Sequence, residues 1–117
     1  MLNHVSLHVN DLEGQKRFYL AALAQLGFET IVEFTNAVGI GIAGRPELWI
    51  KGDGARGQMH IAFSANNRKG VDAFHAAGLL AGGKDNGTPG IRQRPYVTNY
   101  AAFVIDPEGN NIEVVAD

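Results

Sequence analysis

Two histidines and two glutamates occupy matching places in the two halves of the chain. His4 and His60 lie 56 positions apart in the similar segments NHVSLHV and MHIAF. Glu47 and Glu113 lie 66 positions apart and open the similar segments ELWI and EVVA. Imidazoles and carboxylates bind Zn²⁺, Ni²⁺, Mn²⁺ or Fe²⁺, and four such ligands leave positions open for water or a bidentate oxygen substrate. The spacing therefore predicts one two-fold metal site made of His4, Glu47, His60 and Glu113.

The elements that would position these residues form one pattern that is used twice. At the constant spacing of 56, Phe18 recurs as Phe74 and Gly27 recurs as Gly83. Each copy has a stretch of alternating apolar residues, an asparagine that can cap a helix, and then apolar residues at helical spacing. This pattern predicts a strand followed by a helix in each copy. Because neither unit buries its apolar face alone, the two copies must pack together within one chain or between chains.

Each half of the chain predicts the element order βαβββ. In the first half we expect a strand over 2–9, a helix capped by Asn10 or Asp11 and ending near Leu26, and strands over 29–34, 37–42 and 47–51. In the second half we expect a strand over 59–65, a helix over 67–80, and strands over 82–86, 98–105 and 111–116. A Gly-rich linker is expected over 51–58, a long loop over 87–96, and a hairpin turn at DPEGNN. The chain is then one domain of two modules, about 1–51 and 59–117.

Composition excludes several classes of protein. The chain has 117 residues, of which 45% are hydrophobic and 19% charged, as in an ordinary soluble domain, and no apolar run is long enough to span a bilayer. No cysteine is present, so disulfides and thiolate chemistry are excluded. A net charge of −2 gives no reason to expect a nucleic-acid partner. The alternating N-terminus shows no secretory signal, so a cytoplasmic protein with a small-molecule partner and no membrane partner is expected.

Three segments carry a resemblance to a known family: NHVSLHVNDLEGQKRFY, MHIAF and AAFVIDPEGNNIEVV. The third is the most specific, because it joins two strands through an Asp-Pro-x-Gly-Asn turn and has a glutamate in its last strand. With the strands between them, these segments cover essentially the whole chain. The chain resembles a small glyoxalase-like member of the vicinal oxygen chelate superfamily, which includes glyoxalase I, bleomycin- and fosfomycin-resistance proteins and extradiol dioxygenases.

This resemblance implies an α+β fold in which two βαβββ modules form an open, incomplete barrel, usually in a dimer. It also implies a site on the concave face, with metal ligands on the first and last strands of the modules at His4, Glu47, His60 and Glu113. Unpaired strand edges and apolar faces of half-barrel modules likewise favour a homodimer.

Two functions remain open from the sequence. In a metal-dependent lyase or isomerase of the glyoxalase type, the ion would act as a Lewis acid on a substrate chelated through neighbouring oxygens, and Glu47 or Glu113 would be the catalytic base. In a metal-free protein of the bleomycin-resistance type, the same face would sequester a flat or cationic small molecule. An extradiol dioxygenase fits less well, because such enzymes generally use two histidines and one carboxylate in a longer chain. The candidate substrate-binding residues are Trp49, Tyr96, Tyr100 and Phe103 as aromatic walls, and Arg92 and Arg94 as an anion clamp.

Overall fold

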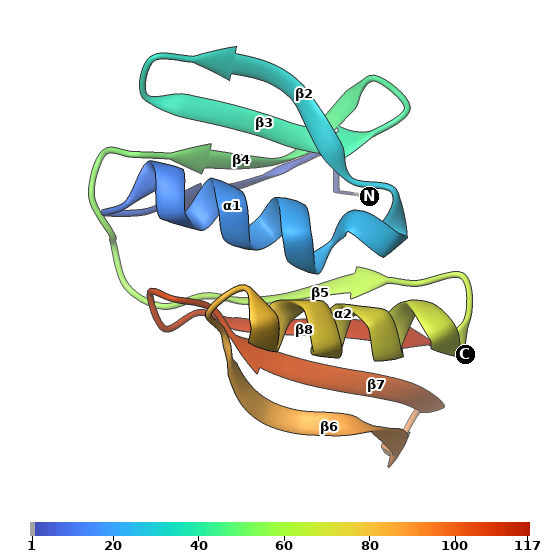
Figure 1. Cartoon of the computed structure of the whole chain (residues 1–117). Helices are drawn as coiled ribbons and strands as arrows, with labels where there is room; N and C mark the ends of the chain where they lie inside the picture. The colour runs from blue at the N-terminus through green and yellow to red at the C-terminus, as the bar shows by residue number, and fades with distance from the viewer. Residues whose placement is uncertain (1) are drawn as a thin grey trace.

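The computed structural model describes residues 2–117, which form two βαβββ units in chain order (Figure 1). The first unit contains β1 (Val5–His8), α1 (Leu12–Ala22), the short 3₁₀ helix η1 (Ala24–Leu26), β2 (Glu29–Phe34), β3 (Ala37–Ile42) and β4 (Arg45–Lys51). The second unit contains β5 (His60–Ser64), α2 (Arg68–Leu80), β6 (Lys84–Gln93), β7 (Thr98–Ile105) and β8 (Asn111–Ala116). Within residues 2–117, neither helix has the length and apolar character needed to cross a membrane.

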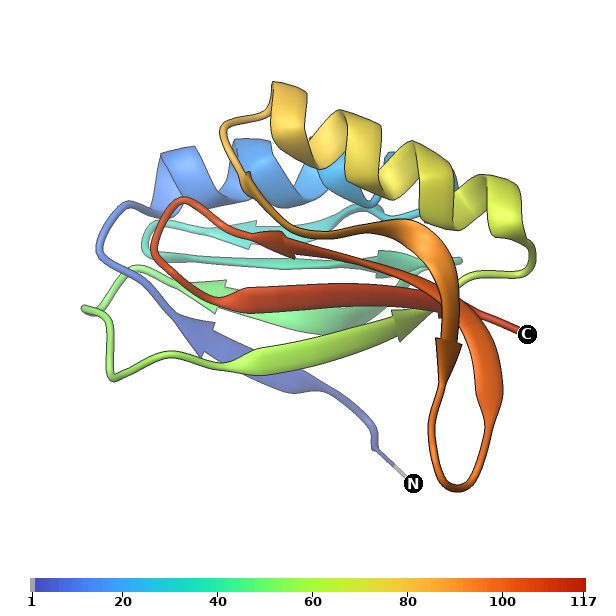
Figure 2. The same cartoon turned by 90° about the horizontal axis from the view of Figure 1, so that it is seen from below.

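Each unit builds its own four-stranded sheet. The strand orders are β1-β4-β3-β2 and β5-β8-β7-β6, and in both sheets the first strand runs parallel to the last. Figure 1 shows α1 and α2 side by side over the two sheets, and Figure 2 shows that both lie on the same side of the sheets. We call the opposite side the helix-free face, since no helix formed by residues 2–117 covers it. The sheets do not close into a barrel, so the predicted α+β fold of two modules in an open arrangement is confirmed.

Equivalent residues cap the two helices. The side chain of Asp11 accepts a hydrogen bond from the backbone N–H of Gly14 at 3.0 Å, and that of Asn67 accepts one from Gly70 at 3.1 Å. Such caps satisfy a backbone donor that has no partner within the helix. Gly27, which ends the first helical segment, has a φ of 91°, a conformation that side chains disfavour. The helix boundaries therefore follow from local chemistry.

The predicted long loop over 87–96 is wrong for most of its length, because β6 continues as a strand to Gln93. Its glycines and proline resemble a loop in sequence. However, β6 is an edge strand, where one side of the backbone needs no partner and bulges are tolerated. The register with β7 shifts between Asp85 and Gly87 and again between Gly87 and Gly90, which absorbs the irregular residues. The connection to β7 is a tight turn in which Arg94 N–H donates to the carbonyl of Val97 at 3.0 Å.

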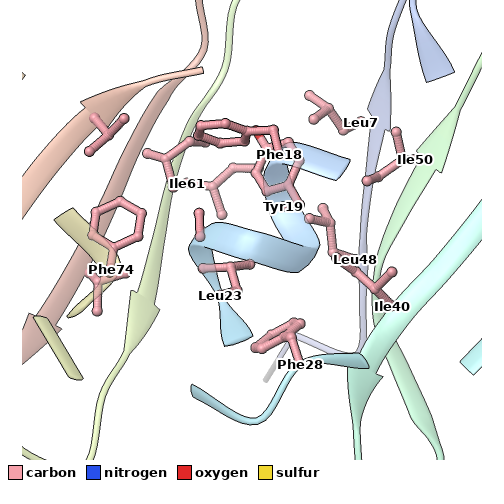
Figure 3. Packing of buried hydrophobic residues seen from close by; sticks show 14 of the residues in the cluster. Leu7, Phe18, Tyr19, Leu23, Phe28, Ile40, Leu48, Ile50, Ile61 and Phe74 are labelled. Atoms are coloured by element: carbon pink, nitrogen blue, oxygen red, sulfur yellow. The ribbon is translucent and has the colours of Figure 1, made fainter. Parts of the chain in front are cut away.

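One apolar core joins the two units. Phe18 and Tyr19 of α1 and Leu23, which directly follows it, are at most 1% exposed and lie between the two sheets, as Figure 3 shows. The rings of Phe18 and Tyr19 meet edge to face at 5.0 Å. Phe74 of α2 and Ile61 of β5 belong to the same cluster. The two copies thus bury their apolar faces against each other within one chain.

The turn between β7 and β8 also connects the two units. Asp106 is 3% exposed, and its Oδ2 accepts hydrogen bonds from Gln15 Nε2 at 2.9 Å and from the Tyr19 hydroxyl at 2.5 Å, both on α1. Its Oδ1 accepts from the backbone N–H groups of Glu108 and Asn110 at 2.8 and 2.9 Å. Burial raises the pKa of Tyr19 well above its ordinary value, and the charge of Asp106 adds to the effect. The DPEGNN segment is therefore a hairpin turn that also binds the second unit to the helix of the first.

Candidate functional site

The helix-free face of the first sheet carries most of the predicted chemistry of that unit. Leu7, Leu48 and Ile50 are at most 1% exposed on the side of α1. Because side chains alternate along a strand, their neighbours point to the other side of the sheet. Six side chains share the helix-free face in this way: His4, directly before β1, Ser6 and His8 of β1, and Glu47, Trp49 and Lys51 of β4.

The strand register changes which residues are equivalent in the two units. Val5 of β1 pairs with Leu48 of β4, and Ile61 of β5 pairs with Ile112 of β8. Val5 and Ile61 are 56 positions apart, as predicted, but Leu48 and Ile112 are 64 apart. The last strands therefore correspond at a spacing of 64, two residues short of the 66 used to align them from the sequence.

Trp49 consequently takes the place in the first sheet that Glu113 takes in the second, and Glu47 corresponds to Asn111. The predicted equivalence of Glu47 with Glu113 is wrong. A shift of two residues keeps every side chain on the same face of a strand, so periodicity cannot distinguish the two alignments. Only the pairing of each last strand with its first strand does so.

His60, Arg94 and Glu113 form a polar cluster on the helix-free face of the second sheet. His60 Nε2 lies 3.0 Å from Glu113 Oε1, and Arg94 Nη2 donates to Glu113 Oε2 at 3.2 Å. Glu113 is 3% exposed, and a buried carboxylate requires partners of this kind. Arg94 reaches it because the β6–β7 hairpin bends toward the helix-free side, as Figure 2 shows. Both oxygens of Glu113 are therefore already bonded within the chain.

Phe103 and Arg92 lie beside this cluster. The ring of Phe103 is 6.2 Å from that of His60, and the guanidinium of Arg92 lies over Phe103 at 5.7 Å from its centroid. Arg92 Nη2 also donates to the carbonyl of Thr88 at 2.7 Å. The structure thus brings Arg92, Arg94 and Phe103 together with His60 on one face.

Two predicted aromatic contacts lie elsewhere. The hydroxyl of Tyr100 donates to Asp72 of α2 at 2.5 Å, which places Tyr100 on the helix side of the sheet, and this hydrogen bond raises its pKa. Tyr96 lies in the turn of the β6–β7 hairpin and is 94% exposed. Neither side chain joins the cluster around Glu113.

His4 and Glu47 line a cavity of about 140 Å³ between the two sheets, facing residues 61–63 of β5. Within residues 2–117, no three His, Asp or Glu side chains come close enough together to hold an ion. Trp49 stands where the symmetric carboxylate would be, and Arg94 places a positive charge against Glu113. The described residues of one chain therefore do not gather the four predicted ligands around one ion. Their assignment as a metal site stays a prediction.

A larger cavity of about 470 Å³ lies on the helix-free face of the first sheet, over Trp49. The indole rests against Gly39 of β3, where a Cβ would come within 3.1 Å of the ring, closer than an ordinary van der Waals contact. Phe34 of β2 is 63% exposed, and its ring is nearly parallel to the indole at 17°, with 6.3 Å between centroids. The lining consists of His4, Ser6, Phe34, Ala37, Trp49 and Lys51.

Phe34 and Lys51 are site residues that the sequence reasoning missed. Lys51 lies two positions after Trp49 in the same strand, so alternation alone could have placed it on the face of Trp49. Phe34 comes from a different strand and reaches the cavity through the pairing of β2, β3 and β4. No sequence signal marks that contact.

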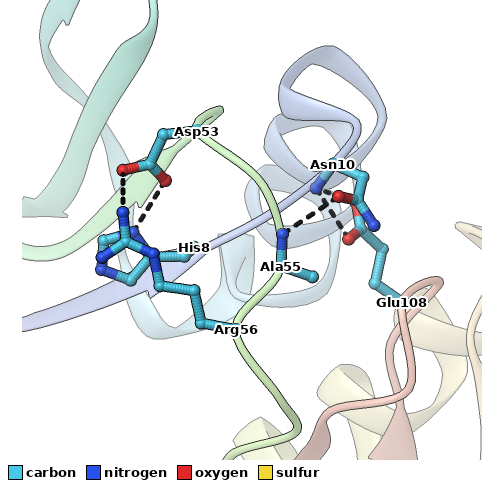
Figure 4. A network of polar contacts seen from close by, with 6 residues as sticks. All are labelled: His8, Asn10, Asp53, Ala55, Arg56 and Glu108. Carbon is cyan, nitrogen blue, oxygen red and sulfur yellow. Dashed lines mark hydrogen bonds and ion pairs between the residues drawn. The ribbon is translucent and has the colours of Figure 1, made fainter.

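One end of this face is closed by an ion-pair network in the linker (Figure 4). His8 Nδ1 lies 2.7 Å from Asp53 Oδ1, and Arg56 Nη2 donates to Asp53 Oδ2 at 3.0 Å. The hydrogen bond with His8 is the main reason that the pKa of Asp53 lies below its ordinary value of 3.8, and the charge of Arg56 lowers it further. The negative charge of Asp53 is therefore neutralised locally.

Glu108, also drawn in Figure 4, binds the start of α1 from the other unit. Its carboxylate accepts hydrogen bonds from the backbone N–H groups of Asn10 and Asp11, both at 2.8 Å. A negative charge at this end of a helix is favourable, because the backbone donors and the helix dipole point toward it. The side chain of Asn10 accepts from Ala55 N–H at 3.0 Å, which fixes the linker beside the same turn.

Searches with protein-family models and among curated proteins find no match to the chain. Solved structures do match. A glyoxalase/bleomycin resistance protein from Albidiferax ferrireducens is 32% identical over 100% of this chain and 99% of its own, with a TM-score of 0.89. A lactoylglutathione lyase from Agrobacterium tumefaciens has a TM-score of 0.74 at 19% identity, over 99% and 92% of the two chains. A glyoxalase/bleomycin resistance protein/dioxygenase family enzyme from Burkholderia phytofirmans has a TM-score of 0.75 at 17% identity, over 97% and 96%.

The paired βαβββ units with open helix-free faces define the class: this is a vicinal oxygen chelate fold, as the resemblance implied. The 32% identity over the whole length is more specific than the two fold-level matches. The chain belongs to the glyoxalase/bleomycin resistance protein family.

Proposed function

We propose that this protein is a metal-independent binding protein that sequesters a flat small molecule over Trp49. One observation carries the proposal: Trp49 occupies in the first sheet the place that Glu113 occupies in the second. The first unit therefore offers an aromatic surface where a symmetric metal site would need a carboxylate. Flat ligands stack favourably on such a surface.

The cavity itself supports this function. Its volume of about 470 Å³ lies in the usual range of small-molecule sites, of roughly 300–1,000 Å³. The parallel rings of Trp49 and Phe34 give it an apolar aromatic surface, and a few polar groups border it. Phe34 is 63% exposed, so binding of a flat ligand would remove a large apolar side chain from water.

The polar groups of the second sheet are largely committed to one another. Glu113 is bonded to His60 and Arg94, and Arg92 is bonded to Thr88. This arrangement leaves few free catalytic groups on the second sheet, which favours a binding function. Arg92, Arg94 and Phe103, predicted as substrate contacts, do not line the cavity over Trp49, so that role stays a prediction.

A second copy of the chain would complete the site. Exposed apolar side chains include Phe34 at 63%, on the helix-free face of the first sheet, and Val97 at 45%, next to the β6–β7 turn. Burying them between two copies would stabilise a homodimer. We therefore keep the homodimer as part of the proposal.

The experiment uses Trp49 as its own reporter. It is the only tryptophan of the chain, so a ¹H–¹⁵N correlation spectrum has a single indole N–H signal. In protein treated with a chelator, neutral and charged naphthalene derivatives should shift that signal in a saturable way and raise the melting temperature by mass action. Trp49→Ala should abolish the stabilisation. Leu80→Ala, which truncates a 91% exposed side chain at the end of α2, should retain it. Binding that requires a divalent ion would contradict the proposal.

A metal-dependent lyase or isomerase of the glyoxalase type is the second candidate. It is favoured by the 3.0 Å contact between His60 and Glu113, which puts an imidazole beside a carboxylate. In this case His4 and Glu47 of a second copy of the chain would complete the ligand set, and Glu47 or Glu113 would be the base. Chelator-stripped protein should then gain thermal stability with Ni²⁺, Zn²⁺ or Mn²⁺, and His60→Ala should lose that gain. Unchanged melting temperatures with all three ions would count against it.

A further inference from the structure

The cavity over Trp49 has one cationic end. Lys51 is the only lining residue with a permanent charge, since the other five are His4, Ser6, Phe34, Ala37 and Trp49. The side chain lies two positions after Trp49 on the same face of β4 and is partly buried. Among residues 2–117, no carboxylate forms an ion pair with Lys51. A lysine in such a place gains from an anionic partner.

The surroundings of Lys51 do not supply that partner. His8 is its neighbour in the strand register, and Asp53, two positions after Lys51, is bonded to both His8 and Arg56. Asp53 is therefore neutralised by its own contacts (Figure 4). His8 and Arg56 thus bind the acid at this end of the face, and Lys51 does not share it.

The opposite end of the strand has the other charge. Glu47, two positions before Trp49, is exposed and lines the separate cavity between the sheets. The lining of the Trp49 cavity excludes it. Along β4, Glu47 thus lies outside the cavity, the Trp49 ring forms part of its lining, and Lys51 places an ammonium group in the lining two positions further on.

We propose that the cavity selects planar aromatic anions, with the ring over Trp49 and the acid group bound to Lys51 Nζ. This inference rests on the proposed function and names the class of its ligand. The ring would bury the exposed face of Phe34, and the acid would receive charge-assisted hydrogen bonds from the ammonium group. A cationic ligand of the same shape would meet repulsion at Lys51.

Three matched probes test this selection: 2-naphthoate, 2-naphthylmethanol and 2-naphthylmethylammonium. Binding is followed through the single indole N–H signal of Trp49 in the full chain. A charge-assisted contact at a partly exposed site should make 2-naphthoate bind about tenfold more tightly than the neutral probe. The cation should bind more weakly than either. Raising the salt concentration should reduce the preference for the anion, because it screens the ammonium charge.

Variants assign the preference to one side chain. Lys51→Met should weaken 2-naphthoate about tenfold and leave the neutral probe unchanged, whereas Lys51→Arg should retain most of the preference. Lys69→Met, on the exposed surface of α2, is the matched control and should change neither. The comparison of the three probes on the unmodified protein tests the selection of anions even where a variant fails to fold.

The possible outcomes separate this inference from the function beneath it. Equal affinity for all three probes, or tighter binding of the cation, would overturn the selection of anions while the binding function stands. The same holds where Lys51→Met leaves the affinity for 2-naphthoate unchanged. No shift of the indole signal with any probe would overturn both proposals.

Discussion

Asp106 offers the sharpest test of how the two units are held together. In Asp106→Ala, the Tyr19 hydroxyl and the Gln15 amide lose their shared acceptor inside the core, where both residues are at most 1% exposed. A buried donor left without a partner costs about 1–3 kcal/mol. Two such donors, together with the loss of the turn's own hydrogen bonds, predict a decrease of roughly 3–5 kcal/mol in the free energy of unfolding. That is a large part of the roughly 5–15 kcal/mol typical of a domain.

A double-mutant cycle with Tyr19→Phe isolates one contact. In the unmodified protein, Tyr19→Phe removes a hydrogen bond to a charged acceptor and should cost about 1.5–3 kcal/mol. In the Asp106→Ala background the hydroxyl is already unpaired, so removing it should be neutral or stabilising. The coupling energy should therefore be about 1–3 kcal/mol.

Urea unfolding at pH 7, followed by far-UV circular dichroism, measures all four proteins. Unchanged m-values would show that the same surface is exposed on unfolding in each of them. Additive effects, with coupling below about 0.5 kcal/mol, would refute the role assigned to the Tyr19–Asp106 contact. If Asp106→Ala lowers the free energy of unfolding by less than about 1 kcal/mol, the role of the turn in joining the two units is refuted.

Three further predictions concern pH, the helix start and assembly. His8 and Arg56 lower the pKa of Asp53 below its ordinary value of 3.8. Their contacts with the carboxylate therefore stabilise the fold above pH 3.8, and this stabilisation is lost as the pH falls through the lowered pKa. Between pH 7 and pH 3, the free energy of unfolding measured in urea should fall less in Asp53→Asn than in the unmodified protein. Glu108→Gln should lower the free energy of unfolding by about 0.3–1 kcal/mol through the weaker interaction with the start of α1, while Glu29→Gln on an exposed strand position should not. Sedimentation velocity at micromolar concentration should give a homodimer, and a stable monomer on dilution would contradict the proposed assembly.

Local chemistry explains why so much of the fold could be predicted. Strands β2, β3, β7 and β8 have the predicted boundaries, because alternation and the turn residues around them act over a few positions. Asp11 and Asn67 cap their helices through hydrogen bonds to residues three positions away. The open two-module fold followed from the repeat itself, since neither copy can bury its apolar face alone.

Long-range pairing decided the rest. The stretch of β6 that is rich in Gly and Pro forms a strand because it lies at the edge of the sheet and pairs with the whole length of β7. Neither condition can be read from the sequence of β6 itself. Tyr100 lies on the side of α2, whereas Phe103, three positions later in the same strand, lies on the helix-free face. The contact of Arg94 with Glu113 requires the hairpin to bend toward the helix-free side of the sheet.

The candidate site shows the same division. The sequence by itself determined the four-residue pattern of His4, Glu47, His60 and Glu113 and the faces on which these side chains lie. The tertiary structure decided which residues are equivalent, because pairing with β1 and β5 sets the register and gives Trp49 the place that corresponds to Glu113. Periodicity of two cannot detect a shift of two residues, whereas backbone hydrogen bonds between parallel strands permit only one register. In that register the two equivalent positions carry Trp49 in the first unit and Glu113, paired with Arg94, in the second, where the sequence had suggested two equivalent carboxylates.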